Sequence, residues 1–410
     1  MTPADLSLTV LRAVRRAVDD GELRVDAGAL PTRVKVERPR PGGRGDYASN
    51  IALTLARPAG RAPLDIAEVL KTRLDRTPGL AAVDITGAGF LNFTLCPDAG
   101  QELVDEILRR GSRYGWREPH GETARPVHRA DLRAAVTADA LRRLLVAQGY
   151  RVRTVCEGAA DPDWALLGVR DGAEPGEEGE AEAAARGRLV AEVAPLPVPY
   201  TARELLERLG PDAARWGLLA GAAHDTARLG DDLLRQQEGN PFFRVRYAHS
   251  RTRALRRNAE QLGFGRAPAH GAPGTAGAHD TPGAPGIRET AGVSGTAARA
   301  PGTARTSATA GPRAPGGAEG SEARARRLLA VLGDHPAVLA AATRHRAPDR
   351  VARHLEGVAD ALLDFQHTVL PRGDEKPSAA HRSRLALAEA AGTVLAGGLS
   401  LLGISAPDRI

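Results

Sequence analysis

The sequence predicts a multidomain protein with an α+β N-terminal domain, a short α/β segment and an all-helical C-terminal domain. Helical and strand-like patterns alternate up to about residue 157, whereas every periodic segment after residue 201 is helical. Residues 265–321 are almost only Gly, Ala, Pro, Thr, Ser and Arg, without apolar periodicity, so we expect a disordered insertion there. A chain of 410 residues is long enough for two or three domains.

The composition favours a polyanionic partner and a soluble protein. The formal net charge is +6 and the pI is about 9.8. Nearly all basic residues are arginines, as in the proteins of GC-rich genomes, so their number alone is weak support. Cys96 and Cys156 are too few for a disulfide framework or a zinc site. No apolar run reaches the length of a membrane span and no signal peptide pattern follows Met1, so we expect a cytoplasmic protein.

Helices and strands alternate in the N-terminal domain. Apolar spacing and turn residues predict helices at 3–19, from about Tyr47, at 63–76 and at 101–110, and strands at 33–39, 83–87 and 90–95. The two later strands flank Ala88-Gly89 and form a hairpin-like pair. A glycine cluster at 42–45 is compatible with a phosphate-cradling loop, but a plain turn is the stronger interpretation.

The helix that begins at Asn240-Pro241 is the most informative single element. Asn is a favoured N-cap, and Pro at the first helical position loses no needed hydrogen bond. One stripe of this helix carries Phe243, Tyr247, Ser250 and Ala254, a second carries Arg246, Arg253 and Arg257, and His249 and Arg251 lie between. Rings beside guanidinium groups can hold single-stranded nucleic acid, by stacking on bases and pairing with phosphates. On spacing alone, an ordinary amphipathic helix whose arginines are solvated is the stronger interpretation.

Further helices are expected around it. The segment from about Thr201 to Gly221 reads as one helix. After the insertion, helices follow at 323–333, 336–346, 349–370 and 380–402, and Gly403 is a natural C-cap.

Two C-terminal stretches resemble class I arginyl-tRNA synthetases. The segment GPDAARWGLLAGAAHDTARLGDDL at 210–233, followed by NPFFRVRYAHSR at 240–251, resembles the start of their helical anticodon-binding domain. RLALAEAAGTVLAGGLSLLGISAPDRI at 384–410 resembles their C-terminus, which approaches the anticodon loop. The resemblance implies anticodon-binding roles for five residues of this chain: Asn240, Phe243, Tyr247, His249 and Arg251.

The N-terminal domain shows a similar resemblance. Gly45–Leu53 (GDYASNIAL) and Ile85–Phe93 (ITGAGFLNF) resemble motifs of the additional N-terminal domain of these synthetases, which touches the tRNA elbow at the D-loop. The resemblance implies that Tyr47 stacks on a base and Asn50 reads a base edge. The alternative is that Tyr47 packs in the core and Asn50 caps a helix.

The middle of the chain resembles the catalytic core only in outline. Residues 124–152 keep the frame of the family's first helix, but the ATP-binding H-I-G-H motif is replaced by His128-Arg129-Ala130-Asp131. A carboxylate at Asp131 would repel the ATP phosphates. Ala191–Ala194 (AEVA) takes the place of K-M-S-K. Only about 85 residues lie between 117 and 200, including an acidic run at 171–182, and several βαβ units would need more.

The expected architecture is a multidomain chain with an α+β N-terminal domain, a truncated Rossmann-like α/β remnant and an all-α anticodon-binding bundle. The predicted limits are 1–116 for the elbow-binding domain, 117–200 for the degenerate catalytic remnant, 201–264 and 322–410 for the bundle, and 265–321 for the disordered insertion.

Three functions are compatible with this architecture. The first is a tRNA-binding paralogue without a catalytic site, cofactor or metal, in which His128 and Asp131 mark degenerate positions. Its partners would be tRNA, with arginine tRNA as the expected species, and another tRNA-dependent enzyme, with no membrane. The second is an ATP-dependent arginine–tRNA ligase with a reduced core. The third is a protein–protein interaction module derived from the bundle.

Overall fold

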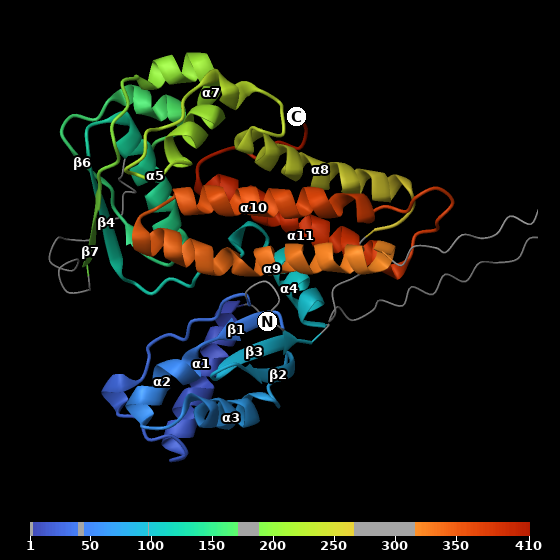
Figure 1. Ribbon diagram of the computed structural model, residues 1–410. Coiled ribbons are helices and arrows are strands. Elements are labelled where there is room, and N and C mark those ends of the chain that lie inside the picture. Colours follow the sequence, from blue (N-terminus) through green and yellow to red (C-terminus); the bar gives the residue numbers. More distant parts are fainter. Residues whose placement is uncertain (1–2, 40–44, 97, 171–187, 266–315) are drawn as a thin grey trace, which may run out of the picture.

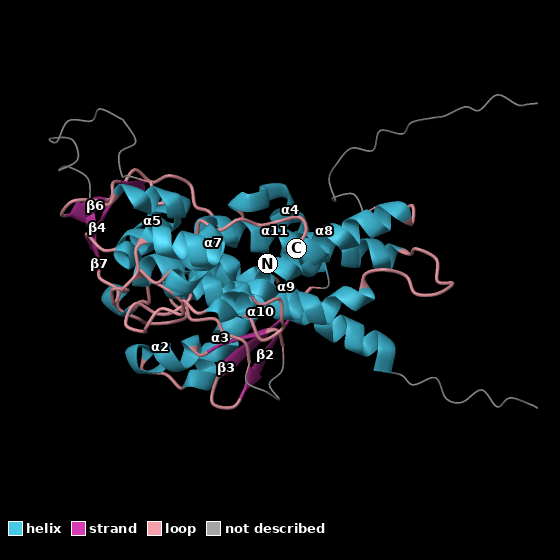
Figure 2. Cartoon of the chain, turned by 90° about the horizontal axis from the view of Figure 1, so that it is seen from above, coloured by secondary structure: helices cyan, strands magenta, loops and turns pink. Residues whose placement is uncertain are grey.

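The protein is described by a computed structural model that covers residues 3–39, 45–96, 98–170, 188–265 and 316–410. The expected disordered insertion and the acidic run fall almost entirely outside the described residues. Figure 1 shows an N-terminal unit beneath a long helical bundle, with a small sheet at one end of the bundle. Seen from above in Figure 2, strands occur only in the N-terminal unit and at that end, and helices with their connecting loops make up the rest of the described chain.

The N-terminal unit packs three helices against an antiparallel sheet. The helices are α1 (Pro3–Asp19), α2 (Ile51–Ala59) and α3 (Pro63–Leu74). The sheet has the order β1 (Tyr47–Ser49), β3 (Phe90–Leu95), β2 (Leu80–Thr86). The predicted apolar faces form its core; Leu6, Val10 and Val14 of α1, for example, are fully buried. The predicted helices at 3–19 and 63–76 and the predicted hairpin are therefore confirmed, as α1, α3 and the pair β2–β3.

Two local predictions for this unit are wrong. Residues 33–39 form no strand; their one strand-like contact is an isolated bridge between Glu37 and Ala48. The helix expected from Tyr47 begins only at Ile51, because residues 47–49 pair with β3. The three residues alternate inward and outward, which buries Tyr47 and Ser49. Pairing with a strand more than forty residues away thus overrides the local helical pattern.

The middle segment is a small parallel sheet with one helix. The central strand β4 (Thr123–Arg129) pairs in parallel with β5 (Arg151–Val152) and β6 (Val155–Glu157), and also with β7 (Arg188–Val193). Helix α5 (Leu132–Ala147) and the short 3-10 helix η3 (Pro162–Leu167) complete it. This strand–helix–strand unit agrees with the pattern predicted at 124–152.

The bundle is built from long helices that run roughly side by side (Figure 1). Its elements are α7 (Ala202–Leu219), η4 (Asp231–Leu234), α8 (Pro241–Gln261), α9 (Gly316–His345), α10 (Asp349–Phe365), η5 (Gln366–Thr368) and α11 (Ala379–Leu401). The two helices predicted at 323–346 form the single helix α9, which accommodates Pro336 in its interior. Helix α7 is kinked at Gly210, whose φ of 72° suits glycine.

The middle segment and the bundle share one hydrophobic core. Helix α4 (Asp98–Arg110) was expected to close the N-terminal domain, yet its residues Leu103, Val104 and Ile107 pack in the core of the bundle. The predicted N-terminal domain, with its limit at residue 116, therefore includes a helix whose side chains belong to the core of the bundle. One face of α5, including Val136 and Leu144, enters the same core.

Two buried arginines connect the middle segment to the bundle. Arg215 of α7 donates from Nη2 to Asp139 Oδ2 of α5 at 2.7 Å, and both side chains are only 1% exposed. Its other nitrogens donate to the carbonyl oxygens of Leu402 and Leu167 at 2.8 and 2.7 Å. Arg133 of α5 donates to four carbonyl oxygens, of Leu218, Leu196, Asp225 and Ala222. Because buried charges need such partners, these contacts fix the two parts rigidly against each other.

Candidate functional site

The start of α8 is held by Asn240. Its side-chain oxygen accepts hydrogen bonds from the backbone N–H groups of Phe242 and Phe243 at 3.0 and 3.3 Å, which confirms the predicted N-cap. Its amide nitrogen donates to the carbonyl oxygens of Leu233 and Arg235. Asn240 is 4% exposed, so its hydrogen bonds are used inside the protein. We therefore assign it a positioning task instead of the predicted contact with an anticodon base.

An aromatic pair lies on the first turns of α8. The rings of Phe243 and Tyr247 are stacked, with centroids 5.5 Å apart and an interplanar angle of 20°, and both side chains are half-buried. Phe243 and Arg246 border a hollow of about 290 Å³ together with Ile410 at the end of the chain. Of the stripe predicted from the sequence, Phe243 lines this accessible hollow, and Arg246 of the neighbouring basic stripe adds a guanidinium group.

Sequence reasoning missed part of this hollow. Its remaining wall comes from Leu209–Ala213 and Leu233–Gln236, where Arg235 and Gln236 add polar groups. Residues 210–213 belong to the stretch that carries the family resemblance and 233–236 lie just before Asn240, but neither position in the sequence indicates a shared wall with α8. The wall exists because α7 and η4 pack beside α8 in three dimensions.

The predicted basic stripe of α8 is largely paired within the protein. Arg246 lies 3.7 Å from Asp212 and also lies over the ring of Phe242, at 5.2 Å from its centroid. Arg253 pairs with Asp408 at 3.0 Å. These arginines therefore present a partly neutralised surface, and the C-terminal tail covers part of it.

His249 anchors the C-terminal tail. Its Nδ1 donates to the carbonyl oxygen of Pro407 at 3.0 Å, since a carbonyl can only accept, and the side chain is 1% exposed. Burial lowers the pKa of His249, and nearby Arg253 lowers it further, against the Pro407 hydrogen bond, which raises it. The imidazole is therefore neutral near pH 7. The predicted base contact by His249 is corrected, because its ring lies beneath the tail.

Arg251 is similarly engaged. Its Nε donates to Gln366 Oε1 in η5 at 2.9 Å, so the residue ties α8 to the end of α10. The predicted anticodon group thus separates into two sets. Phe243 lines the hollow with Tyr247 stacked on it, whereas Asn240, His249 and Arg251 make internal contacts.

The two residues predicted to touch the tRNA elbow lie differently in the N-terminal unit. Tyr47 is 5% exposed in the core, and burial raises the pKa of its hydroxyl to about 12. Its ring has no free face for a base, so the predicted stacking is corrected and the core alternative holds. Asn50 is exposed at the N-cap position of α2, and its side chain makes no capping hydrogen bond. Asn50 therefore remains a candidate contact.

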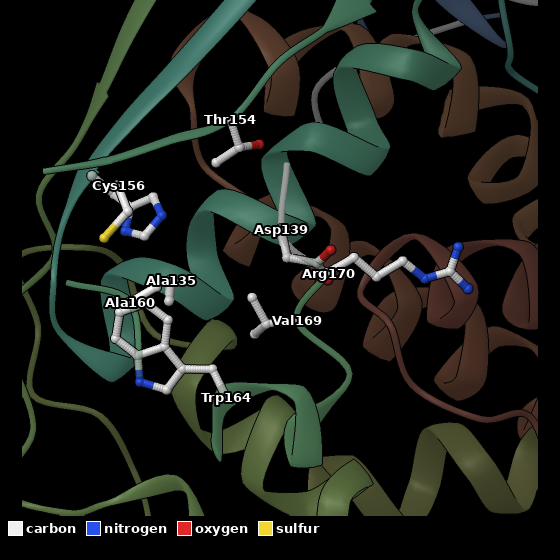
Figure 3. Close-up of a pocket in the computed structure, with 9 residues that line it drawn as sticks. Ala135, Asp139, Thr154, Cys156, Ala160, Trp164, Val169 and Arg170 are labelled. Atoms are coloured by element: carbon white, nitrogen blue, oxygen red, sulfur yellow. The ribbon is translucent and has the colours of Figure 1, made fainter. Parts of the chain in front are cut away.

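Parallel α/β sheets bind their ligands at the carboxyl ends of their strands, which makes the carboxyl end of β4 the place to look for a ligand site. His128 lies there, and its Nδ1 donates to the carbonyl oxygen of Arg129 at 2.8 Å. Figure 3 shows that Trp164, Cys156 and Thr154 crowd this end of the sheet. The remaining cavity measures only about 40 Å³.

Asp131 has a clear local task. Its carboxylate accepts a hydrogen bond from the backbone N–H of Ala134 at 2.9 Å and caps α5. The residue that replaces the second histidine of the family motif thus stabilises the helix start.

Two other properties concern only the described part of the chain. It contains no group of three or more His, Cys, Asp or Glu side chains placed to hold a metal ion. None of its helices is both long and apolar enough to cross a membrane.

Comparisons with known proteins agree with this architecture. The family model described as arginyl tRNA synthetase N terminal domain matches residues 7–95, and the DALR anticodon binding domain matches residues 293–410. The chain is 32% identical to the arginine–tRNA ligase of Frankia alni over 599 aligned positions, with 100% of both chains covered. It is 30% identical to that of Renibacterium salmoninarum over 595 positions, again with full coverage.

Solved structures show the same fold. The arginyl-tRNA synthetase of Thermus thermophilus superimposes with a TM-score of 0.59 at 15% identity, covering 100% of each chain. That of Plasmodium falciparum gives 0.60 at 9% identity, also with full coverage. Together with the full-length similarity to the Frankia ligase, these findings establish the family: the chain is an arginyl-tRNA synthetase-like protein with a DALR anticodon-binding domain, and it belongs to the arginyl-tRNA synthetase family.

Proposed function

We propose that this protein binds tRNA through the hollow at the start of α8 and does not activate an amino acid. The observation that carries the proposal is the contrast between two places in the structure. The hollow beside Phe243 and Arg246 is accessible and measures about 290 Å³, whereas the cavity at the carboxyl end of β4 measures about 40 Å³.

The sheet end is unsuited to a nucleotide. Small-molecule sites usually have volumes of roughly 300–1,000 Å³, several times the space beside His128. Trp164 is 6% exposed, with its ring centroid 6.0 Å from that of His128, so the indole fills the site. The side chain of Asp131 is committed to capping α5 and supplies no positive charge for phosphates. These contacts support the interpretation of residues 117–200 as a truncated, Rossmann-like remnant.

The length of the alignment supports the same interpretation. A chain of 410 residues can extend over 599 aligned positions only with long gaps. The chain thus lacks a large part of what its full-length relatives contain. Within the remnant, the resemblance places the two lysines of the family motif at Ala191, which is buried in β7, and at Ala194, which is exposed; neither side chain offers a cation to ATP.

The hollow has the chemistry of single-strand recognition. A base that enters the hollow can stack on the ring of Phe243, and the Arg246 guanidinium can turn from Asp212, 3.7 Å away, to a phosphate. Ile410 closes one side of the hollow, so the docked tail is part of the wall. An anticodon loop presents the unpaired bases that such a surface needs.

Filter binding tests this proposal. Wild-type protein should retain arginine tRNA at moderate salt in preference to duplex DNA of equal length, and binding should weaken steeply as salt rises. Phe243→Ala should weaken tRNA binding by roughly ten-fold, since base–aromatic stacking contributes about 1–3 kcal/mol. Leu262→Ala is the matched control, because Leu262 is an exposed apolar residue at the other end of α8. Equal affinity for tRNA and DNA would refute the proposal.

A ligase activity is the second candidate, because the full-length relatives are named arginine–tRNA ligases. Under this alternative ATP is required, and the cavity beside His128 must open to admit it. ATP–pyrophosphate exchange with arginine distinguishes the two functions. Exchange above the background of a heat-denatured sample would establish the ligase and overturn the non-catalytic proposal.

A further inference from the structure

A second basic cavity lies at the opposite end of the bundle. It has a volume of about 330 Å³ and is bordered by the first turns of α9, by η5 with the loop after it, and by the first turns of α11. Its charged and titratable lining residues are Arg324, His367, Arg372, Glu375, His381 and Arg384. Helix α8 has 21 residues and is therefore about 30 Å long, which separates this cavity from the hollow at its start.

The cavity gathers cationic groups from three separate segments. Arg324 and Arg384 are half-buried, Arg372 is exposed, and the single carboxylate in the lining is that of Glu375. Arg384 donates from Nη1 to the carbonyl oxygen of Thr368 at 3.2 Å, and Arg372 donates from Nη2 to that of His367 at 2.6 Å. A guanidinium has five N–H donors, so these bonds position the two arginines and leave further donors for a ligand.

His381 adds a buried donor. The side chain is 2% exposed, and its Nδ1 accepts a hydrogen bond from the backbone N–H of Ser378 at 3.2 Å. Because Nδ1 accepts, the proton of the neutral ring is on Nε2, which lies 3.6 Å from Glu375 Oε1. The ring therefore presents an N–H group to an anionic oxygen. Ser378 and His381 form a capping box at the N-terminus of α11, and a helix N-terminus also favours negative charge.

We propose that this cavity binds a phosphate group, with Arg324, Arg372 and Arg384 as its cationic ligands and Glu375 as a partial competitor. Planar guanidinium groups match the geometry of phosphate oxygens, and three of them outweigh one carboxylate. The volume accommodates a small phosphate compound or a phosphodiester of the tRNA backbone. The tRNA source rests on the proposed function, whereas the small-phosphate source does not.

Two binding measurements test the site with the full-length protein. Inorganic pyrophosphate is titrated calorimetrically, and fluorescently labelled arginine tRNA is titrated by anisotropy. The pocket variant is Arg324→Gln with Arg372→Gln. Its matched control is Arg326→Gln with Arg382→Gln, which removes the same charge from exposed positions of α9 and α11 outside the lining. A third variant, Glu375→Gln, removes the competing carboxylate.

The pocket variant should weaken binding of at least one probe by roughly five-fold or more relative to the control variant, because charged hydrogen bonds are lost. Glu375→Gln should strengthen binding of the same probe. An effect on pyrophosphate assigns a small phosphate ligand, and an effect on tRNA alone assigns a backbone phosphate. If the wild type binds pyrophosphate but not tRNA, the proposed function fails and this site stands. If neither probe distinguishes the pocket variant from the control, the site is refuted.

Discussion

Replacing Asp139 by Asn should destabilise the shared core of the middle segment and the bundle. The carboxylate is 1% exposed and faces the equally buried guanidinium of Arg215 at 2.7 Å. Burial raises the pKa of Asp139, but Arg215 and Arg143 outweigh it, so the net pKa is lowered and the group is ionised at pH 7. After the substitution, Arg215 keeps its hydrogen bonds to the carbonyl oxygens of Leu402 and Leu167 but loses its closest counter-charge.

The expected loss is about 3 kcal/mol of unfolding free energy. Removing one partner of a buried ion pair usually costs about 3–5 kcal/mol, because the other charge is left without compensation. Asn retains an oxygen that accepts a hydrogen bond, and Arg143, at 3.0 Å from Asp139, can reorient toward solvent. Both effects place the expected loss at the low end of that range.

Tryptophan fluorescence during urea unfolding measures this loss selectively. The chain has three tryptophans; Trp164 and Trp216 lie in the shared core and Trp116 packs against it. The signal therefore reports on this core and not on the N-terminal unit. Asp231→Asn is the control, since Asp231 pairs with Arg208 but is 71% exposed, and exposed pairs contribute at most about 1 kcal/mol. Equal, small losses for both variants would refute the assigned role of the buried pair.

Three further outcomes are expected. Burial lowers the pKa of His354 from 6.5 to about 4, so the unfolded state binds more protons between these values. Through this group stability should fall by about 3 kcal/mol as pH drops through that window, which urea unfolding at several pH values measures. His354→Phe should reduce the dependence without abolishing it, because burial also lowers the pKa of the neighbouring His335. His249→Ala should release the C-terminal tail, so backbone amides of residues 404–410 should exchange hydrogen faster than in the control variant Arg256→Ala. Unchanged exchange would contradict the anchor at Pro407. Tyr47→Ala removes a buried aromatic side chain and should lower the unfolding free energy of the N-terminal unit by about 3–5 kcal/mol, as measured by unfolding followed by circular dichroism. A unit of unchanged stability with weaker tRNA binding would restore the base-contact role.

Local signals in the sequence predicted many elements well. Helix α1 has the predicted limits, and the Asn240-Pro241 start of α8 is as expected, because caps and apolar spacing act over a few residues. The hairpin of β2 and β3 follows from its turn residues. Strand β1 could not be predicted in this way, because its three residues are extended only through pairing with β3.

The predicted anticodon-binding residues fall into an accessible set and an internally bonded set, again because of contacts with distant segments. Helical spacing placed Phe243 and Tyr247 on one stripe, and in the structure their rings stack, with Phe243 lining an accessible hollow. The same spacing does not show which neighbouring residues another segment covers. The tail covers His249, and η5 engages Arg251, through contacts with residues more than one hundred positions away.

The sequence by itself determined the family resemblance, the helical character of the C-terminal half and, as that resemblance implies, the replacement of the two ATP motifs at 128–131 and 191–194. These properties depend on residue identity and short-range spacing. Only the tertiary structure decided that Trp164 lines the small cavity beside His128, that the middle segment shares its core with the bundle, and that three arginines converge on a second cavity. Burial and convergence are properties of distant segments packed together, and local spacing carries no information about which segments those are.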